Sequence, residues 1–409
     1  MIPCLDPIGA DSAPFAFMAL GMVLLAWSRW RHLFSSVFLA ASLAILATWL
    51  KPWDVISLAG FLVPPYLAAR HLWGRKDRAG LPMASVVIAV QVAAFVVLRR
   101  YEILGGLPFM DHPVAVVGLS YMLFRVLHLV IEAPYLGHLP FGLASYLSYV
   151  LAFWTLLSGP IQRYDAFVVG MAAVGRPAAA EALAAAHRAV NGLIKAFLLA
   201  PVFLKASDIA LLKAPEATWL DAATVFYAYP VYLYLSFSGY TDLMISIGRL
   251  CGAATLPENF DRPYLARNIK DFWGRWHMSF GAWIKAYIFN PLSKRLVAAS
   301  PPGKDGPALA AAVIATFVVV GVWHGTTINF VVFGLLHGMA IIGTELYGRL
   351  LKARLGRAGR KAFEAHPATR ALATVLCFHF VCATILLFPN SLGDLGEVLE
   401  IFLKGRGWL

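Results

Sequence analysis

Charged residues are scarce in this 409-residue sequence, since Asp, Glu, Lys and Arg together make up only 14% of it. Hydrophobic residues make up 60%, against roughly 45–50% in soluble domains. A chain with so few charges and so much apolar surface is typical of a protein that lipid, not water, solvates. The length is ample for a polytopic bundle, because each crossing needs only about 20 apolar residues.

Several chemical motifs are missing as well. The four cysteines (Cys4, Cys251, Cys377 and Cys382) have no zinc, redox or disulfide spacing. No H-E-x-x-H pair, no G-x-S-x-G nucleophile elbow and no phosphate-binding G-x-x-x-x-G-K-[ST] loop occurs. We therefore expect no metal site and no bound cofactor. The first residues (MIPCLDPIGADSAPF) also lack the basic region of a cleaved signal peptide, so we expect an uncleaved first helix.

Acidic residues are fewer than basic ones, which gives a net charge of +12. The basic residues gather in short blocks between apolar runs, at 70–78 and 349–361. Short loops rich in Lys and Arg stay on the cytoplasmic side of a membrane. We interpret the blocks as cytoplasmic loops that touch anionic lipid, not as nucleic-acid contacts. The predicted location is the cell (inner) membrane, with several crossings.

Apolar runs of helical length are what the sequence has in abundance. They lie near 14–28, 33–50, 54–69, 83–98, 112–131, 142–158, 191–212, 220–238, 307–323, 328–347 and 371–388. They predict an all-α polytopic membrane protein with about ten or eleven embedded helices. No linker divides the chain, so we expect one domain over 1–409. No internal repeat is visible, which weighs against an inverted-repeat transporter.

Residues 251–305 differ from the rest, because they contain no long apolar run. Three tryptophans (Trp273, Trp276 and Trp283) stand there among several arginines and lysines. Polar backbone at membrane depth is tolerated only where protein or water lines it. We predict re-entrant or interfacial helices at about 255–300, in two pieces (265–285 and 287–299), beside a central tunnel.

Five histidines lie in or near apolar runs: His128, His277, His324, His337 and His379. Ionisable residues inside a membrane are costly, and they often mark a substrate or proton path. Each could equally be structural, hydrogen-bonded to a neighbouring helix. Without metal, triad or phosphate-loop motifs, the chemistry that remains is a histidine acting as general base.

Several stretches resemble the membrane-bound O-acyltransferase family. They are SGPIQRY (158–164), SGYTDL (238–243), PENFDRPYLARNIKDFWGRWHMSFGAWIKAYIFNPL (257–292), the WHG around His324 and NFVVFGLLHG (329–338). The resemblance covers roughly 158–347, with a looser echo at 378–388. It is nearest to the branches that modify bacterial envelope polysaccharides. Most stretches are similar to the D-alanyl branch of teichoic-acid synthesis, and SGYTD to the alginate O-acetylation branch.

The resemblance implies an enzyme that moves an acyl group from a cytosolic thioester to a hydroxyl inside a membrane tunnel. The donor would be a phosphopantetheine thioester, either on an acyl carrier protein or as acetyl-CoA. The acceptor would be an extracytoplasmic polysaccharide, reached with the help of a separate extracytoplasmic transferase. His324 matches the family's essential histidine, and His277 matches the histidine of its RWH motif.

Neighbours of these two histidines are candidate tunnel residues. The candidates are Trp273, Arg275, Trp276, Trp323, Asn268, Asn329 and His337. The tryptophans could instead anchor the chain at the membrane interface. Either asparagine could donate to an oxyanion or simply satisfy backbone at a helix break.

This sequence departs from the family pattern after the RWH motif. It reads Trp283-Ile-Lys-Ala-Tyr287 where the family usually has an acidic residue. Lys294 and Arg295 follow nearby and would give a basic mouth that suits an acidic carrier protein.

Two other functions fit a polytopic chain. One is a non-catalytic transporter or export scaffold for a polysaccharide or lipid-linked sugar. The other is a family member that acylates a protein or a lipid. The concentration of histidine and tryptophan in the C-terminal half favours an enzyme over a transporter, and the short chain with its bacterial-branch motifs weighs against a protein or lipid acceptor.

Overall fold

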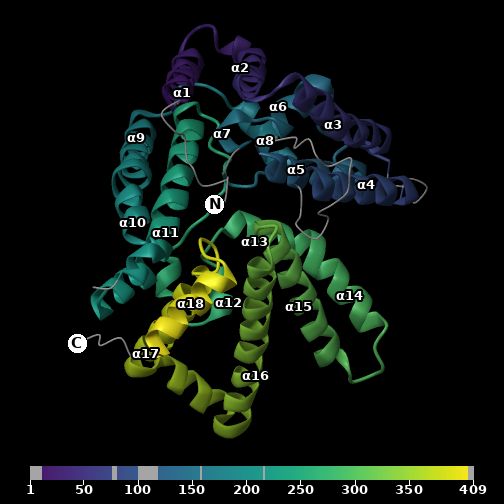
Figure 1. Ribbon diagram of the computed structural model, residues 1–409. Helices are drawn as coiled ribbons and strands as arrows, with labels where there is room; N and C mark the ends of the chain where they lie inside the picture. Colours follow the sequence, from purple (N-terminus) through teal and green to yellow (C-terminus); the bar gives the residue numbers. More distant parts are fainter. Residues whose placement is uncertain (1–11, 76–80, 100–117, 157–158, 215–216, 404–409) are drawn as a thin grey trace. The chain divides into compact units, whose positions relative to one another are not determined.

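The computed structural model describes residues 12–75, 81–99, 118–156, 159–214 and 217–403 (Figure 1). Every named element in this part of the chain is a helix, and the only β-pairing in it is an isolated bridge between Phe260 and Trp276. The all-α prediction is confirmed. The chain divides into two compact units. The described residues of the N-terminal unit fall within 4–194 and 239–257, and those of the C-terminal unit fall within 195–238 and 258–409. The expectation of a single domain stays a prediction.

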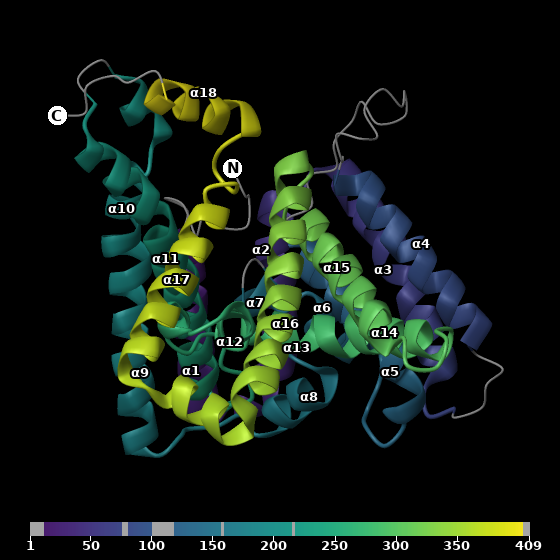
Figure 2. The same cartoon turned by 90° about the horizontal axis from the view of Figure 1, so that it is seen from below.

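The N-terminal unit contains α1 (Ser12–Trp27), η2 (Arg31–Leu33), α2 (Phe34–Trp49), α3 (Pro52–Leu72), α4 (Leu81–Arg99), α5 (Leu119–Glu132), η6 (Ala133–Tyr135), α6 (Leu143–Val150), α7 (Phe153–Leu156), α8 (Tyr164–Ala172) and α9 (Ala179–Leu193). Helices α3, α4 and α5 pack against one another (Figures 1 and 2). The last part of the long helix α11 (Trp219–Leu250) also belongs to this unit.

A buried arginine holds the break between α6 and α7. Arg125, only 1% exposed, donates from Nη1 to the carbonyls of Tyr149 and Val150 and from Nη2 to that of Thr155. These carbonyls lie where the helix is interrupted and so lack helical partners. The predicted single segment over 142–158 is therefore divided in two, and its last two residues lie outside the described part.

The C-terminal unit begins with η7 (Ile194–Leu199), α10 (Ala200–Ala206), η8 (Ile209–Lys213) and the first part of α11. It continues with η9 (Pro263–Leu265), α12 (Ile269–Trp273), α13 (Met278–Ile284), η10 (Lys285–Phe289), α14 (Asn290–Ala298), α15 (Asp305–His324), α16 (Ile328–Ala365), α17 (Pro367–Ile385) and α18 (Leu392–Leu403). Helices α15 and α16 lie side by side in both views (Figures 1 and 2). Helix α16 bends at Gly356, whose positive φ of 69° suits a residue without a Cβ.

Within the described residues, six helices are long and apolar enough to cross a membrane. They are Pro52–Leu72, Pro82–Arg99, Ala179–Lys213, Asp305–His324, Ile328–Ala365 and Pro367–Ile385. Two shorter apolar helices, Phe15–Trp27 and Arg31–Ala47, correspond to the first two predicted segments. Large apolar side chains remain exposed on these helices, such as Val86 on α4 and Leu376 on α17, as expected where lipid covers the surface. A count of ten or eleven embedded helices stays a prediction.

The segment predicted to hold two re-entrant pieces is more broken than expected. Instead of one helix over 265–285, α12 ends at Trp273 and α13 begins at Met278. His277 stands between them with φ +47° and ψ +51°, a left-handed conformation that no helix interior accepts. From Met278 the chain then stays helical through α13, the π-helical η10 and α14, so the predicted gap near residue 286 is wrong.

Candidate active site

The candidate site lies beside two extended segments of the C-terminal unit, residues 259–261 and 275–278, which pair with each other. The Asp261 amide donates to the Arg275 carbonyl (2.9 Å), and the Met278 amide donates to the Asn259 carbonyl (3.0 Å). The two segments therefore run antiparallel on either side of the bridge between Phe260 and Trp276. This pairing brings His277 beside Asn259, although 18 residues separate them in the sequence.

His277 and His324 meet around two aromatic rings. The His277 ring stacks on Phe280 with a centroid distance of 4.9 Å, and Phe280 stacks on Trp323 at 4.5 Å. The His324 ring lies 6.1 Å from Phe280 and 4.7 Å from Trp323. We call these four residues the histidine–aromatic cluster. They come from α13, its N-terminal flank and the end of α15, so the structure brings both predicted catalytic histidines to one place.

The two histidines differ in exposure. His277 is 2% exposed, and burial together with repulsion from a charged His324 holds the pKa of its imidazole well below the usual 6.5. His277 lies between α11 and α15, outside the helices that could cross the membrane. His324 is half-buried and packs its ring against Phe388 at 5.1 Å and Phe333 at 5.7 Å. The arrangement gives one buried imidazole whose neutral form is favoured and a second imidazole that is only half-buried.

Hydrogen bonds fix the tautomer of His277. The Asn259 side-chain oxygen Oδ1 lies 3.1 Å from the Ser279 amide, 2.8 Å from the Ser279 hydroxyl and 3.2 Å from His277 Nδ1. An amide N–H can only donate, so the Asn259 atom that faces it is the oxygen. Among the described residues, His277 Nε2 is buried without a hydrogen-bond partner. Asn259 is 0% exposed, and the sequence analysis assigned it no role although it stands in the matched PENF stretch.

His337 lies close by, but both of its ring nitrogens are engaged. Trp273 Nε1 donates to His337 Nδ1 (3.1 Å), which makes Nδ1 an acceptor, and His337 Nε2 lies 2.9 Å from the Thr384 hydroxyl. Its ring packs on Phe333 at 4.3 Å and on Phe380 at 5.3 Å. His337 therefore ties α12, α16 and α17 together through Trp273 and Thr384.

The other weighed histidines are hydrogen-bonded away from the cluster. In the N-terminal unit, His128 Nε2 accepts from the Tyr164 amide (3.1 Å). In the C-terminal unit, His379 Nδ1 lies 2.7 Å from the Val375 carbonyl, and its Nε2 lies 2.8 Å from the Tyr227 hydroxyl. Because these ring nitrogens already have hydrogen-bond partners, we interpret His128 and His379 as structural histidines.

The remaining predicted tunnel residues lie outside the histidine–aromatic cluster. Trp276 is buried in an aromatic cluster with Phe260 and Phe272. Asn268 accepts from the Asp271 amide (2.9 Å) and so caps α12. Asn329 donates to the Asn390 carbonyl (2.7 Å), which ties the start of α16 to the chain after α17.

Arg275 and the predicted docking pair are charged groups at the surface. Arg275 pairs with Asp271 at 2.7 Å and with Asp261 at 3.6 Å, and the hydrogen bond to Asp271 raises the pKa of its guanidinium. Lys294 and Arg295 stand exposed on α14. Among the described residues no group of three His, Cys, Asp or Glu side chains could hold a metal ion.

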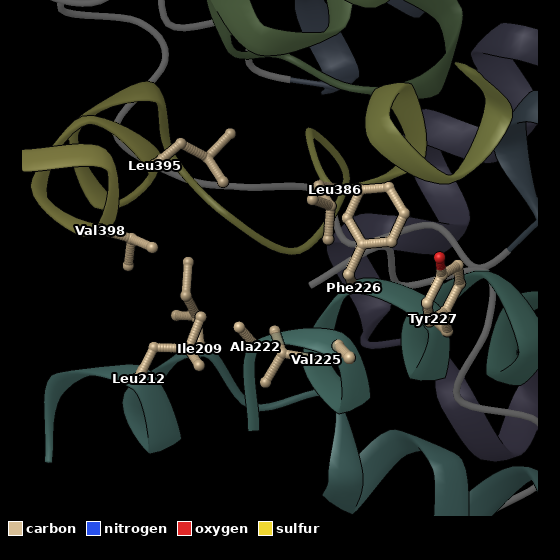
Figure 3. Close-up of a pocket in the computed structure, with 10 residues that line it drawn as sticks. Ile209, Leu212, Ala222, Val225, Phe226, Tyr227, Leu386, Leu395 and Val398 are labelled. Atoms are coloured by element: carbon tan, nitrogen blue, oxygen red, sulfur yellow. The ribbon is translucent and has the colours of Figure 1, made fainter. Parts of the chain in front are cut away.

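Two cavities are lined by described residues of the C-terminal unit. One of about 540 Å³ lies between the start of α12, the second half of α16 and α17. Its lining includes Asn268, apolar side chains and three arginines. The arginines are Arg267, Arg360 and Arg370. Phe380, which packs on His337, also belongs to its wall. The other cavity, of about 360 Å³, is apolar apart from the Tyr227 hydroxyl and lies between η8, α11 and the chain from Leu386 into α18 (Figure 3).

Comparisons with known proteins agree with the motifs. The profile of the membrane-bound O-acyltransferase family matches residues 12–383. A teichoic acid D-alanyltransferase of Bacillus subtilis is 28% identical over 365 residues, covering 83% of each chain. One from Streptococcus thermophilus is 29% identical over 290 residues, covering 68% of this chain and 69% of its own. A probable alginate O-acetylase of Pseudomonas fluorescens is 26% identical over 344 residues, covering 78% of this chain and 62% of its own. The profile spans both compact units, well beyond the 158–347 stretch on which the sequence motifs lie.

Proposed function

Since this chain belongs to the membrane-bound O-acyltransferase family, we propose that it passes D-alanyl or acetyl from a cytosolic thioester through a membrane tunnel to a cell-envelope polysaccharide. The family's chemistry makes the protein a multi-pass membrane enzyme that transfers acyl groups to hydroxyl oxygens. This removes the support for a non-catalytic transporter. The identity of the acyl group, its thioester donor, the extracytoplasmic partner transferase and the inner-membrane location belong to the proposal.

The observation that carries the proposal is the meeting of His277 and His324 in the histidine–aromatic cluster. In the proposed reaction the hydroxyl oxygen of the acceptor attacks the thioester carbonyl carbon. The new C–O bond forms as the C–S bond breaks, and the hydroxyl proton passes to a histidine nitrogen. That proton then reaches the departing sulfur, which leaves as a thiol. Aromatic walls exclude the water that would hydrolyse the thioester.

The cavity beside α12 supports a cytosolic entrance for the donor. Its three arginines suit the phosphate of a phosphopantetheine arm, and its apolar side chains suit the rest of that arm. Arg360 is already paired with Glu364 (2.6 Å) and Arg267 with Asp271 (3.9 Å). Arg370 has no ion pair among the described residues and is the arginine most available to a phosphate.

The test is acyl transfer by purified protein in nanodiscs, supplied in turn with radiolabelled acetyl-CoA and with a D-alanyl-loaded carrier protein. We expect His324→Ala and His277→Ala each to lower transfer by about 10²–10⁴-fold, the usual contribution of a positioned acid or base. His366→Ala is the matched control, because this histidine is exposed at the junction of α16 and α17. Undiminished transfer by folded His324→Ala protein would refute the proposal.

The two donors separate the two branches. Transfer from the carrier alone identifies a D-alanyl enzyme, and reversing Lys294 and Arg295 to Glu should then raise the KM for the carrier. Transfer from acetyl-CoA alone identifies an O-acetylase, whose KM the same reversal leaves unchanged. Label recovered on a protein or lipid, not on polysaccharide, would point to the alternative acceptors.

A further inference from the structure

The hydrogen bonds around Asn259 determine which nitrogen of His277 carries a proton. Asn259 Oδ1 accepts from two Ser279 donors and cannot itself donate. His277 Nδ1, 3.2 Å away, must therefore carry the hydrogen of a neutral imidazole. Nε2 is then left with its lone pair, buried and without a hydrogen-bond partner among the described residues.

We propose that Asn259 is a positioning residue that holds His277 as the Nδ1–H tautomer, so that Nε2 presents its lone pair to the acceptor hydroxyl. This rests on the proposed acyl transfer. With the opposite tautomer, Nε2 would point an N–H at the hydroxyl hydrogen and could not accept it. The role is the one that an orienting carboxylate plays toward a catalytic histidine, filled here by an amide.

The backbone supports the same assignment. His277 adopts the left-handed conformation, which residues other than glycine rarely adopt. The backbone carbonyl of Asn259 accepts a hydrogen bond from the amide of Met278, the residue that follows His277 (3.0 Å). Asn259 thus holds the strained turn through its main chain and the ring through its side chain. Strain of this kind persists where the surroundings over-determine it, and it gathers at functional sites.

A purely structural asparagine would give a different result from a positioning one. If Asn259 only caps the start of α13, then removing any contact to its oxygen should lower the stability of the protein by a similar amount. The tautomer of the His277 ring should then have no effect on kcat. If it positions His277, loss of the acceptor should change the tautomer and kcat. The binding sites for the acyl acceptor and the thioester donor should be unchanged, so the KM values for both substrates should change little.

The experiment combines kinetics with ¹⁵N NMR of histidine-labelled protein in nanodiscs near pH 7.5, with His277→Gln assigning the signal. In the wild type we expect a protonated Nδ1 and an unprotonated Nε2. Asn259→Leu should lose this preference and lower kcat by about 100-fold, with KM within about threefold. Asn259→Asp keeps an acceptor oxygen, and it should retain the Nδ1–H tautomer and kcat within about tenfold.

Two controls keep the test sharp. Ser279→Ala removes one contact to the same oxygen and should leave tautomer and kcat near wild type. Asn191→Leu alters an exposed asparagine whose Nδ2 lies 3.5 Å from His187 Nδ1, far along the chain on α9, and should be silent.

The idea is overturned if wild-type His277 shows a protonated Nε2, or if Asn259→Asp loses as much kcat as Asn259→Leu. Should Asn259→Leu fail to fold, the wild-type tautomer and the Asn259→Asp variant still decide. Active His277→Ala protein would instead sink the proposed function and leave the tautomer assignment standing.

Discussion

At the scale of single residues, the depressed pKa of His277 predicts how activity depends on pH. Burial, followed by repulsion from a charged His324, keeps this imidazole neutral well below pH 6.5. A neutral imidazole is the form that accepts a proton. We therefore expect kcat to stay level as pH falls from 8 through 6.5 and to decline only well below pH 6.5. A half-maximal kcat at pH 6.5 or above would contradict the assignment.

The same shift predicts a loss of stability in acid. An unfolded chain takes up a proton on His277 as pH falls through 6.5, whereas the folded protein does not. The unfolded state then binds more protons, so the free energy of unfolding decreases as pH drops below 6.5. The fall in Tm between pH 7.5 and 5.5 should be smaller in His277→Gln, which has no group to titrate there.

Motif reading located His277 and His324, but it could not find Asn259. The two histidines stand in ordered stretches that carry their own signal. Asn259 acquires its role only because residues 259–261 pair with 275–278, a contact across 18 residues that no local pattern encodes. The sequence likewise did not decide whether His337 is catalytic or structural. Its hydrogen bonds to Trp273 and Thr384 show that, unlike His277, it has both ring nitrogens engaged.

At the scale of elements, glycines set how closely α15 and α16 approach. A Cβ at Gly334 would overlap the Phe317 carbonyl oxygen, and one at Gly321 would overlap that of Phe330. Small residues at such crossings let backbones meet in membrane helices. Because His324 ends α15 and packs on Phe333 of α16, this contact helps to place the His324 ring.

We predict that Gly334→Ala destabilises the protein by about 1–3 kcal/mol, the usual cost of overpacking. It should lower the Tm in detergent and reduce transfer, since the clash is with backbone and not with a mobile side chain. Gly343→Ala is the matched control on the same helix, because nothing lies within 4 Å of its added Cβ. Equal Tm values for the two variants would show that the helices can separate without cost.

Apolar runs predicted the long helices of the C-terminal unit, because length and hydropathy suffice for a membrane helix. They failed where a helix ends for a non-local reason. The turn at Gly274–His277 depends on pairing with a distant segment, and the break between α6 and α7 depends on Arg125. Breaks of this kind need partners that the segment's own residues do not reveal.

At the scale of the whole molecule, the distribution of charge predicts how the C-terminal helices are oriented across the membrane. The basic block 349–361 and Arg370 stand at the bend between α16 and α17. The opposite ends of these helices are tied together by the bond from Asn329 to the Asn390 carbonyl. Basic loops usually stay cytosolic, so we expect this bend on the cytosolic side and His324 at the opposite end of the 20-residue helix α15. Such a helix is about 30 Å long.

This orientation predicts labelling of single cysteines from defined sides. In a background with all four cysteines replaced by serine, Arg370→Cys should react with a membrane-impermeant maleimide only from the cytosolic side. Ser391→Cys, exposed just before α18, should react only from the outside. The reverse pattern would invert the direction of acyl transfer and refute a cytosolic donor.

The same two variants test the donor entrance. Arg370 lines the cavity of about 540 Å³ beside α12, so Arg370→Cys should already weaken binding of the thioester donor, and a maleimide at residue 370 should remove most of the remaining transfer. Labelled Ser391→Cys should keep it, because that position lies at the far end of α17 from the cavity. If modification at residue 370 leaves transfer unchanged, the donor reaches His324 by another route, and the arginines around that cavity serve α16 and α17 alone.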